Sequence, residues 1–218
     1  MGVQTVGQRI IFENAKKTLQ NNGVDPGQAV LTQSYLRLEQ PFTTTQTNIL
    51  FPVLLNQQAG GVAQTVTERR LQLQDSFVVS ELAIFLWISA GSPAITHFQS
   101  YPSFFVYGAN AGPAQVLYHS YLTLSVNNQV LVPFWDTFRS YAVFQTQNLA
   151  AIAAASPDDM LNGRDDIFYP TEPNWILIGS KNNILTLVLP NAPATVTANT
   201  KLVIYARGVL AQNSTSVQ

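Results

Sequence analysis

The chain has 218 residues, enough for one domain or a compact pair, and its 46% hydrophobic content excludes disorder for the bulk of it. Only 11% of the residues are Asp, Glu, Lys or Arg, against roughly 25% in an ordinary soluble domain. The net charge of −1 leaves little field to attract phosphate or anionic lipid, and weak self-repulsion favours association. The absence of cysteine excludes disulfides and thiolate chemistry.

Residues 1–30 predict an N-terminal arm with a short helix. In the segment Gln8 to Gln20, Ile11, Ala15 and Leu19 lie near one helical face, and Gly23 is a plausible stop. No apolar segment with a small-residue cleavage site follows the polar start of the chain. We therefore expect synthesis in a cytoplasm.

Two strands are expected before residue 56. From Ser34 to Glu39 apolar and polar residues alternate, which is typical of a half-buried strand. The apolar run from Ile49 to Leu55 is interrupted by Pro52. Because proline donates no hydrogen bond to a sheet, this second strand should lie at a sheet edge or contain a bulge.

The segment Leu71 to Ala90 predicts a long central strand with two apolar faces. It contains Ser80 and Glu81 and has fewer than the about 20 apolar residues that a membrane-spanning helix needs. A period of two assigns its large side chains to two faces, Phe77, Val79, Ala83, Phe85 and Trp87 on one and Val78, Leu82, Ile84, Leu86 and Ile88 on the other. One face can cover the chain's own core, and the other needs a further layer.

The second half of the chain contains short elements separated by turns. An aromatic stretch is followed by a turn-rich segment at 108–114 and by a hairpin from Tyr121 to Pro133, whose turn is Asn127–Asn128. Residues 149–173 are expected to form a loop insertion that starts with one or two alanine-rich helical turns. Three strands are expected near the end of the chain, Trp175 to Ile178, Ile184 to Leu189 and Lys201 to Leu210. Residues 212–218 should form a polar tail.

Together these elements predict an all-β protein. Residues 31–211 should form a single antiparallel sandwich or barrel, and the number and length of the strands suit a jelly roll.

No motif in the sequence indicates catalysis or a cofactor. His97 and His119 have no carboxylate or second histidine at metal-ligand spacing, and no nucleophile elbow or phosphate loop is present. We therefore expect a protein that is not an enzyme and needs no cofactor. One question stays open, namely whether the loop carboxylates bind calcium; these are Asp158, Asp159, Asp165 and Asp166.

A glycan-binding or receptor-binding module is the alternative function. Aromatic side chains beside Asn, Gln or Asp can bind sugars, and the candidates for this role are Tyr101, Tyr118 and Trp135. Core packing is the competing explanation for aromatic residues in strands.

Two stretches carry a resemblance to a known class of proteins, TERRLQLQDSFVVSELAIFLW and YLTLSVNNQVLVPF. With the N-terminal arm and the charge-poor composition, they resemble a bacteriophage virion structural protein, in particular a jelly-roll capsid or capsid-associated subunit. The resemblance implies a non-enzymatic subunit located in the virion, with itself and other virion proteins as partners. Only Arg9, Lys16 and Lys17 are basic before residue 30, so we expect no contact with the packaged nucleic acid.

Two surfaces are candidates for subunit contacts. The first is the second apolar face of the central strand, around Phe85 and Trp87. The second is the arm, at Ile10, Ile11 and Phe12. Burial of either surface, with a rim of neutral amide side chains, would hold subunits together.

Overall fold

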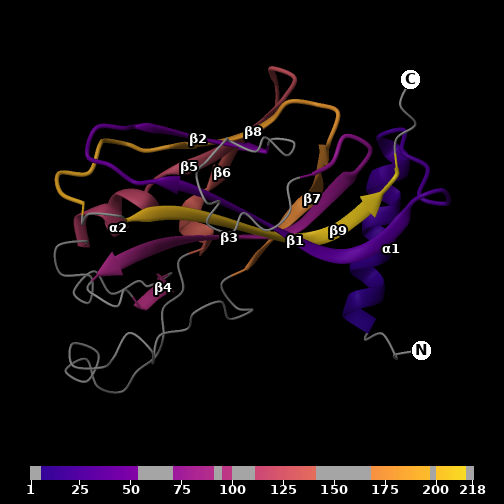
Figure 1. Cartoon of the computed structure of the whole chain (residues 1–218), viewed down its shortest axis with the longest axis horizontal. Helices are drawn as coiled ribbons and strands as arrows, with labels where there is room; N and C mark the ends of the chain where they lie inside the picture. Colours follow the sequence, from indigo (N-terminus) through magenta and orange to yellow (C-terminus); the bar gives the residue numbers. More distant parts are fainter. Residues whose placement is uncertain are drawn as a thin grey trace, which may run out of the picture.

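Two antiparallel sheets pack face to face in the computed structural model, which describes residues 6–53, 71–90, 95–99, 111–140, 168–196 and 200–214 (Figure 1). Sheet A contains, in spatial order, β1 (Val30–Pro41), β9 (Lys201–Gln212), β3 (Ser76–Ala90) and β4 (Ile95–Gln99), with β7 (Tyr169–Ile178) also paired to β3. Sheet B contains β2 (Asn48–Val53), β8 (Asn183–Val188), β5 (Tyr121–Val126) and β6 (Gln129–Asp136).

The strand pairs are nested along the chain. β5 pairs with β6, β3 with β7, β2 with β8 and β1 with β9, and these pairs fall alternately in sheets B and A. This order arises when a long two-stranded ribbon, folded back on itself at the β5–β6 turn, rolls up. The wrapping is that of a jelly roll, with β4 added, and it confirms the predicted all-β sandwich.

Local sequence signals place the turn and one edge correctly. Asn127 and Asn128 have φ values of 49° and 63°, the left-handed conformation that a two-residue hairpin turn requires. Pro52 lies in β2, which is an edge strand of sheet B as predicted.

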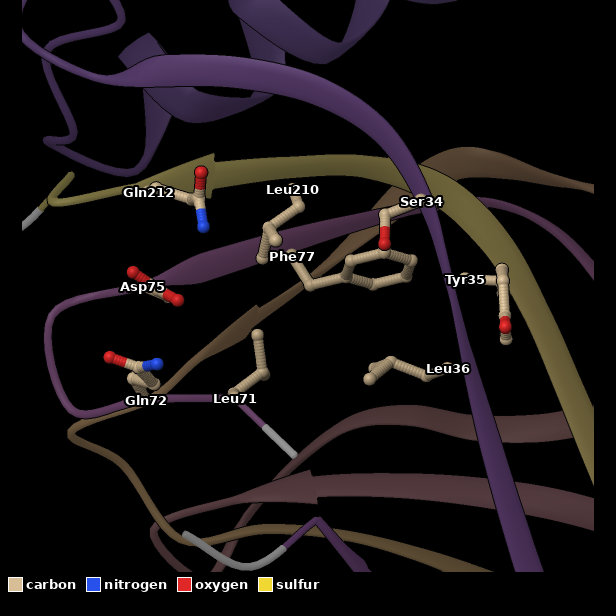
Figure 2. Close-up of a pocket in the computed structure, with 9 residues that line it drawn as sticks. All are labelled: Ser34, Tyr35, Leu36, Leu71, Gln72, Asp75, Phe77, Leu210 and Gln212. Carbon is tan, nitrogen blue, oxygen red and sulfur yellow. The ribbon is translucent and has the colours of Figure 1, made fainter. Parts of the chain in front are cut away.

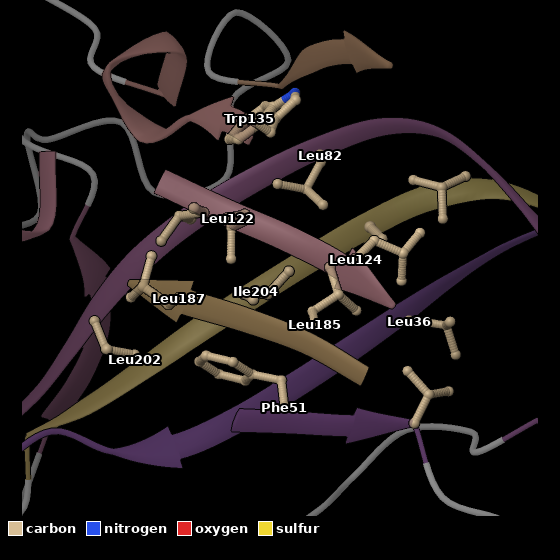
Figure 3. Packing of buried hydrophobic residues seen from close by; sticks show 14 of the residues in the cluster. Leu36, Phe51, Leu82, Leu122, Leu124, Trp135, Leu185, Leu187, Leu202 and Ile204 are labelled. Atoms are coloured by element: carbon tan, nitrogen blue, oxygen red, sulfur yellow. The ribbon is translucent and has the colours of Figure 1, made fainter. Parts of the chain in front are cut away.

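The main hydrophobic core fills the space between the sheets. Figure 3 shows its side chains, which point inward from strands of both sheets, among them Leu36, Phe51, Leu82, Leu122, Leu124, Leu185, Leu187, Leu202 and Ile204. All of these are buried. Each contributes about 1.5–3 kcal/mol by leaving water, which makes this layer the main source of stability.

The face assignment predicted for β3 is wrong beyond Val79. A β-bulge between Val79 and Glu81 shifts the register against both β7 and β9. Because one extra residue reverses the alternation, Phe77 and Val79 share the core face with Leu82, Ile84 and Leu86. Gly208 pairs with Val79 here, and a Cβ atom on it would lie 1.8 Å from the carbonyl oxygen of Val78.

Helix α1 (Val6–Asn21) covers one end of the outer face of sheet A. Ala15 and Leu19 pack on Val78 and Val209 in a second buried cluster. The helix ends at Asn21, and Gly23 just beyond it has a φ of 77°. The carbonyl oxygen of Leu19 accepts hydrogen bonds from the backbone N–H groups of Asn22 and Val24. The predicted helix is thus confirmed, and it supplies part of the further layer that β3 needs.

Two predicted boundaries need correction. The segment 108–114 was expected to be a turn, but helix α2 (Ala111–Tyr118) begins inside it, with Pro113 in the first turn, where no helical N–H is lost. The loop expected at 149–173 ends earlier, because β7 starts at Tyr169. A short 3-10 helix, Thr137–Ser140, follows β6. None of the helices among the described residues is long and apolar enough to cross a membrane.

Replacing Leu19 by Ala should lower the free energy of unfolding by about 2–5 kcal/mol, because the side chain is fully buried under α1. Ile10→Ala is the matched control on the exposed side of the same helix and should change stability by less than about 0.5 kcal/mol. Urea unfolding followed by circular dichroism measures both. Equal losses would contradict the docking of α1 on sheet A.

Candidate interaction surface

The outer face of sheet B is almost free of charge. Asp136, near the end of β6, is the one charged residue in the four strands of this sheet. The strands alternate between buried side chains that face the core and more exposed ones that face outward. This outward set, which we call the B face, consists of Asn48, Leu50, Pro52, Tyr121, Thr123, Ser125, Val130, Phe134, Asp136, Ile184, Thr186 and Val188. Its one charged residue, Asp136, lies at the β6 margin, opposite Tyr121.

Strand register arranges the B face in rows across the sheet. Leu50 is opposite Thr186, which is opposite Thr123 on the next strand. Pro52, Ile184 and Ser125 form the neighbouring row in the same way. Apolar and hydroxyl side chains are therefore mixed, and the surface can exclude water while still offering hydrogen bonds.

The two margins of the B face expose large apolar side chains. Leu50 on β2 is 55% exposed and Phe134 on β6 is 64% exposed. The Phe134 ring stacks on Tyr121, with 4.6 Å between ring centroids, so the aromatic pair forms a flat surface. Solvent-exposed apolar groups of this size, on a sheet with a single charged residue, are typical of an interaction site.

The outer face of sheet A is different because it carries charges and further layers. Glu39 forms ion pairs with Arg37 and with Lys201, the latter at 3.1 Å from Nζ to Oε2. Next to them, the guanidinium of Arg207 lies 3.6 Å from the ring centroid of Phe168. Salt bridges and the α1 layer together occupy this face within the chain itself.

The predicted interface at Phe85 is not supported. Its side chain is buried in a third cluster with Ala83, Phe168 and Val203, and the rings of Phe85 and Phe168 meet edge to face. The bulge places the Phe85 side chain on the outer face of sheet A, where other residues of the same chain cover it. The backbone of Trp87 pairs with Lys201, and the description does not extend to its side chain.

The arm residues divide between packing and exposure. Ile11 and Phe12 are partly buried against the cluster under α1, whereas Ile10 is exposed. The helix of the arm therefore packs on its own chain. Of the three candidate contact residues in the arm, only Ile10 is exposed.

A groove separates the edge strands β6 and β7 on one side of the sandwich. It has a volume of about 380 Å³, and Leu131, Trp135, Trp175 and Ile176 are among the apolar residues that line it. Arg139 also lines it, with its guanidinium 5.9 Å from the Trp135 ring centroid. We call this the β6–β7 groove.

The candidates for sugar binding do not form an exposed aromatic site. Tyr118 is buried because the last residues of α2, Leu117 and Tyr118, belong to the main core instead of an exposed loop. Trp135 is only 4% exposed and meets Trp175 edge to face, at 84° between ring planes. Tyr101 and the four loop aspartates, Asp158, Asp159, Asp165 and Asp166, lie outside the described residues.

A small pocket of about 110 Å³ lies between β1 and the turn before β3 (Figure 2). Ser34, Gln72, Asp75 and Gln212 contribute polar groups, and Phe77 lies deeper. The Asp75 carboxylate accepts a hydrogen bond from the backbone N–H of Asn213 at 3.1 Å, which attaches the start of the predicted tail to the domain. Its carboxylate has a structural role, and the pocket lacks a paired nucleophile and base.

Nothing in the described part of the chain assembles a catalytic or metal centre. No three His, Cys, Asp or Glu side chains converge there to hold a metal ion. His119 is exposed, and of His97 only the backbone is described, in β4. No known protein-family model matches this chain, and comparison with curated proteins finds no significant match.

The B face could not be predicted from the sequence, because each of its strands taken alone shows only a weak apolar pattern on that side. β8 is apolar at Ile184 and Val188 as well as at its core positions, which is the same two-faced pattern that was noticed in the longer β3. Only the pairing with β2 and β5 shows that these positions form one continuous surface.

Replacing Asp75 by Ala should lower stability by about 1–3 kcal/mol, because the backbone N–H of Asn213 loses a charged acceptor. Asp75→Asn is the matched control, since its amide oxygen can accept the same bond. Thermal unfolding of the two variants checks this, and an equal loss in both would show that the negative charge, and not the hydrogen bond, matters.

Proposed function

We propose that this chain is a non-enzymatic structural subunit of a virus particle, as the resemblance to bacteriophage virion proteins suggests. It would act by self-association or by docking on other virion proteins. The observation that carries the proposal is the B face, a solvent-facing sheet surface with a single charged residue at its margin, on a jelly roll, which is a fold common among capsid subunits.

The chemistry of the B face suits a protein partner. Association removes Leu50, Phe134 and Tyr121 from water, and the one charged residue beside them, Asp136, already accepts a hydrogen bond from the backbone N–H of Phe138. The hydroxyl groups of Thr123 and Thr186 can pair across the contact. Such an interface depends on apolar burial and should therefore persist at high salt.

The glycan-binding alternative receives less support. Sugar rings stack on accessible aromatic faces, and the described candidates Tyr118 and Trp135 are buried. A glycan array that gives reproducible hits, with and without calcium, would revive this function and count against a purely structural role.

Sedimentation velocity over a range of concentrations and salt strengths tests the self-association. We expect a discrete oligomer or closed assembly that survives high salt, because neutral contacts are not screened. A monomer under every condition would contradict self-association through the B face.

The double variant Leu50→Lys with Phe134→Lys should weaken association at least about tenfold, equivalent to about 1.4 kcal/mol, because it puts charges on both margins of the B face. Val30→Lys is the matched control, since Val30 is 58% exposed but lies on β1 in sheet A. All of these side chains are exposed, so the variants should keep the β circular dichroism spectrum. Equal association by variant and control would exclude the B face as the interface.

A further inference from the structure

The β6–β7 groove continues past the end of α1 into a second pocket. This pocket has a volume of about 280 Å³ and shares Asn22, Leu131 and Ile176 with the groove. Its other lining residues include Gln129 at the start of β6 and Lys181 in the turn between β7 and β8. The two pockets form one channel along β6, which we call the long groove.

The long groove has the length of a short extended peptide. Its lining residues on β6 begin at Gln129 and reach Trp135, six positions further along. At about 3.3 Å per residue in a strand, this distance is roughly 20 Å, and an extended chain of about seven residues spans it. Leu131, Pro133 and Ile176 line the groove between its ends, so an apolar segment would leave water along most of its length.

Large apolar side chains are exposed along this groove. Leu131 lines both pockets and is 47% exposed, and Phe134 borders the groove next to the B face. Tyr169, whose ring lies beside Arg139, is exposed as well. Because leaving such side chains in water costs free energy, their gathering around one groove indicates a docking site for an apolar segment.

The long groove also contains two cations without an ion pair. Lys16, Arg37 and Lys201 pair with carboxylates elsewhere in the structure. Arg139 lines one pocket and Lys181 the other, and neither has a carboxylate partner among the described residues. In a chain with only 11% charged residues, two unpaired cations along one groove point to a ligand that carries negative charge at both ends.

Aromatic rings hold Arg139 in position. Its guanidinium lies 5.9 Å from the ring centroid of Trp135 and 5.0 Å from that of Tyr169, both within the range of a cation–π contact. A guanidinium that rests against a ring keeps N–H groups at its edge, and a carboxylate can accept two parallel hydrogen bonds from them. Since the side chain is already ordered, it loses little conformational entropy on binding.

Glu172 is the one carboxylate among the described residues that line the long groove. Two positive charges and one negative charge leave the lining with a net charge of +1. A single-stranded nucleic acid fits less well than a peptide, because its regularly spaced phosphates would meet Glu172. Its bases would also find no platform on Trp135 or Trp175, which are buried.

A second copy of this chain does not offer a matching segment in its described part. Asp75 and Glu81 are the one pair of described carboxylates six positions apart, and they lie at the start of the central strand β3 with Asp75 buried. Asp159 and Asp165 have the same spacing and lie outside the described residues. The experiment therefore includes a variant that lacks both of these carboxylates.

We infer that the long groove binds an extended apolar segment of a different protein, whose carboxylates, about six residues apart, pair with Arg139 and Lys181. The apolar side chains between the carboxylates pack on Leu131 and Ile176. This inference rests on the docking to other virion proteins in the proposed function, and it names the site and the chemistry of the partner segment.

Fluorescence polarisation with the purified full chain tests this binding. The probe is a fluorescein-labelled peptide with an amidated end, Asp-Leu-Asn-Leu-Asn-Leu-Asp. Arg139→Gln and Lys181→Gln should each weaken binding at least about fivefold, because each removes a charge-assisted hydrogen bond. Lys17→Gln is the matched control and should leave binding unchanged, since Lys17 is exposed on α1 and does not line the groove.

Two further variants should act in opposite directions. Glu172→Gln should tighten binding about twofold, because it removes the repulsion of an incoming carboxylate. Leu131→Asn should weaken binding at least about fivefold through the loss of an apolar contact. A probe with Asn in place of both Asp residues should bind the unmodified chain at least about tenfold more weakly. All of the replaced side chains are exposed, and circular dichroism checks that the variants fold.

Several results would overturn the inference. One is a probe that does not bind, or that binds equally well after Arg139→Gln and Lys181→Gln. Tighter binding by the double variant Asp159→Asn with Asp165→Asn would show that this chain itself supplies the segment. Weaker self-association of Lys181→Gln in sedimentation would assign the groove to a second copy, and displacement of the probe by an oligothymidylate would assign it to nucleic acid.

The same experiments separate this inference from the self-association proposed for the B face. If the probe does not bind while sedimentation still finds an oligomer, the groove inference is wrong and self-association stands. If the chain is a monomer that binds the probe and loses it in Arg139→Gln, self-association is wrong and docking through the long groove stands.

Discussion

The burial of both faces of β3 is the constraint on which the rest of the structure depends. This strand pairs with β9 along most of its length and with β7 and β4 over parts of it. One face contributes to the core between the sheets, and the other is covered by α1 at one end and by Phe168 further along. The bulge opposite Gly208 permits this, because it moves Leu82, Ile84 and Leu86 onto the core side.

Residues of the same chain cover much of the outer face of sheet A, and in this respect it differs from sheet B. Strands β1 and β9 carry the ion pairs of Glu39 and the cation–π contact of Arg207 on the outer face of sheet A, and α1 and Phe168 cover other parts of it. None of the described helices packs over Leu50, Thr186 and Thr123 of sheet B, and Leu50 is 55% exposed. A charge-poor sequence can remain folded with this surface in water, but it gains free energy when a partner covers it.

The edges of the two sheets carry similar protection. Proline residues interrupt β2 and β7, and charges mark β1, so these edges resist the addition of further strands. β6 carries Pro133, Asp136 and two register shifts against β5, which protect it in the same way.

Local sequence patterns determined the elements of this protein, and pairing decided their arrangement. Alternation, the Asn127–Asn128 turn and Pro52 predicted the strands, the hairpin and an edge because each depends on neighbouring residues only. The faces of β3 could not be predicted past Val79, since the bulge arises from close approach to Gly208, which is more than a hundred positions away. Likewise, only tertiary structure could show that Phe85 is covered and that four separate strands form one face with a single charge, because burial depends on contacts between distant segments.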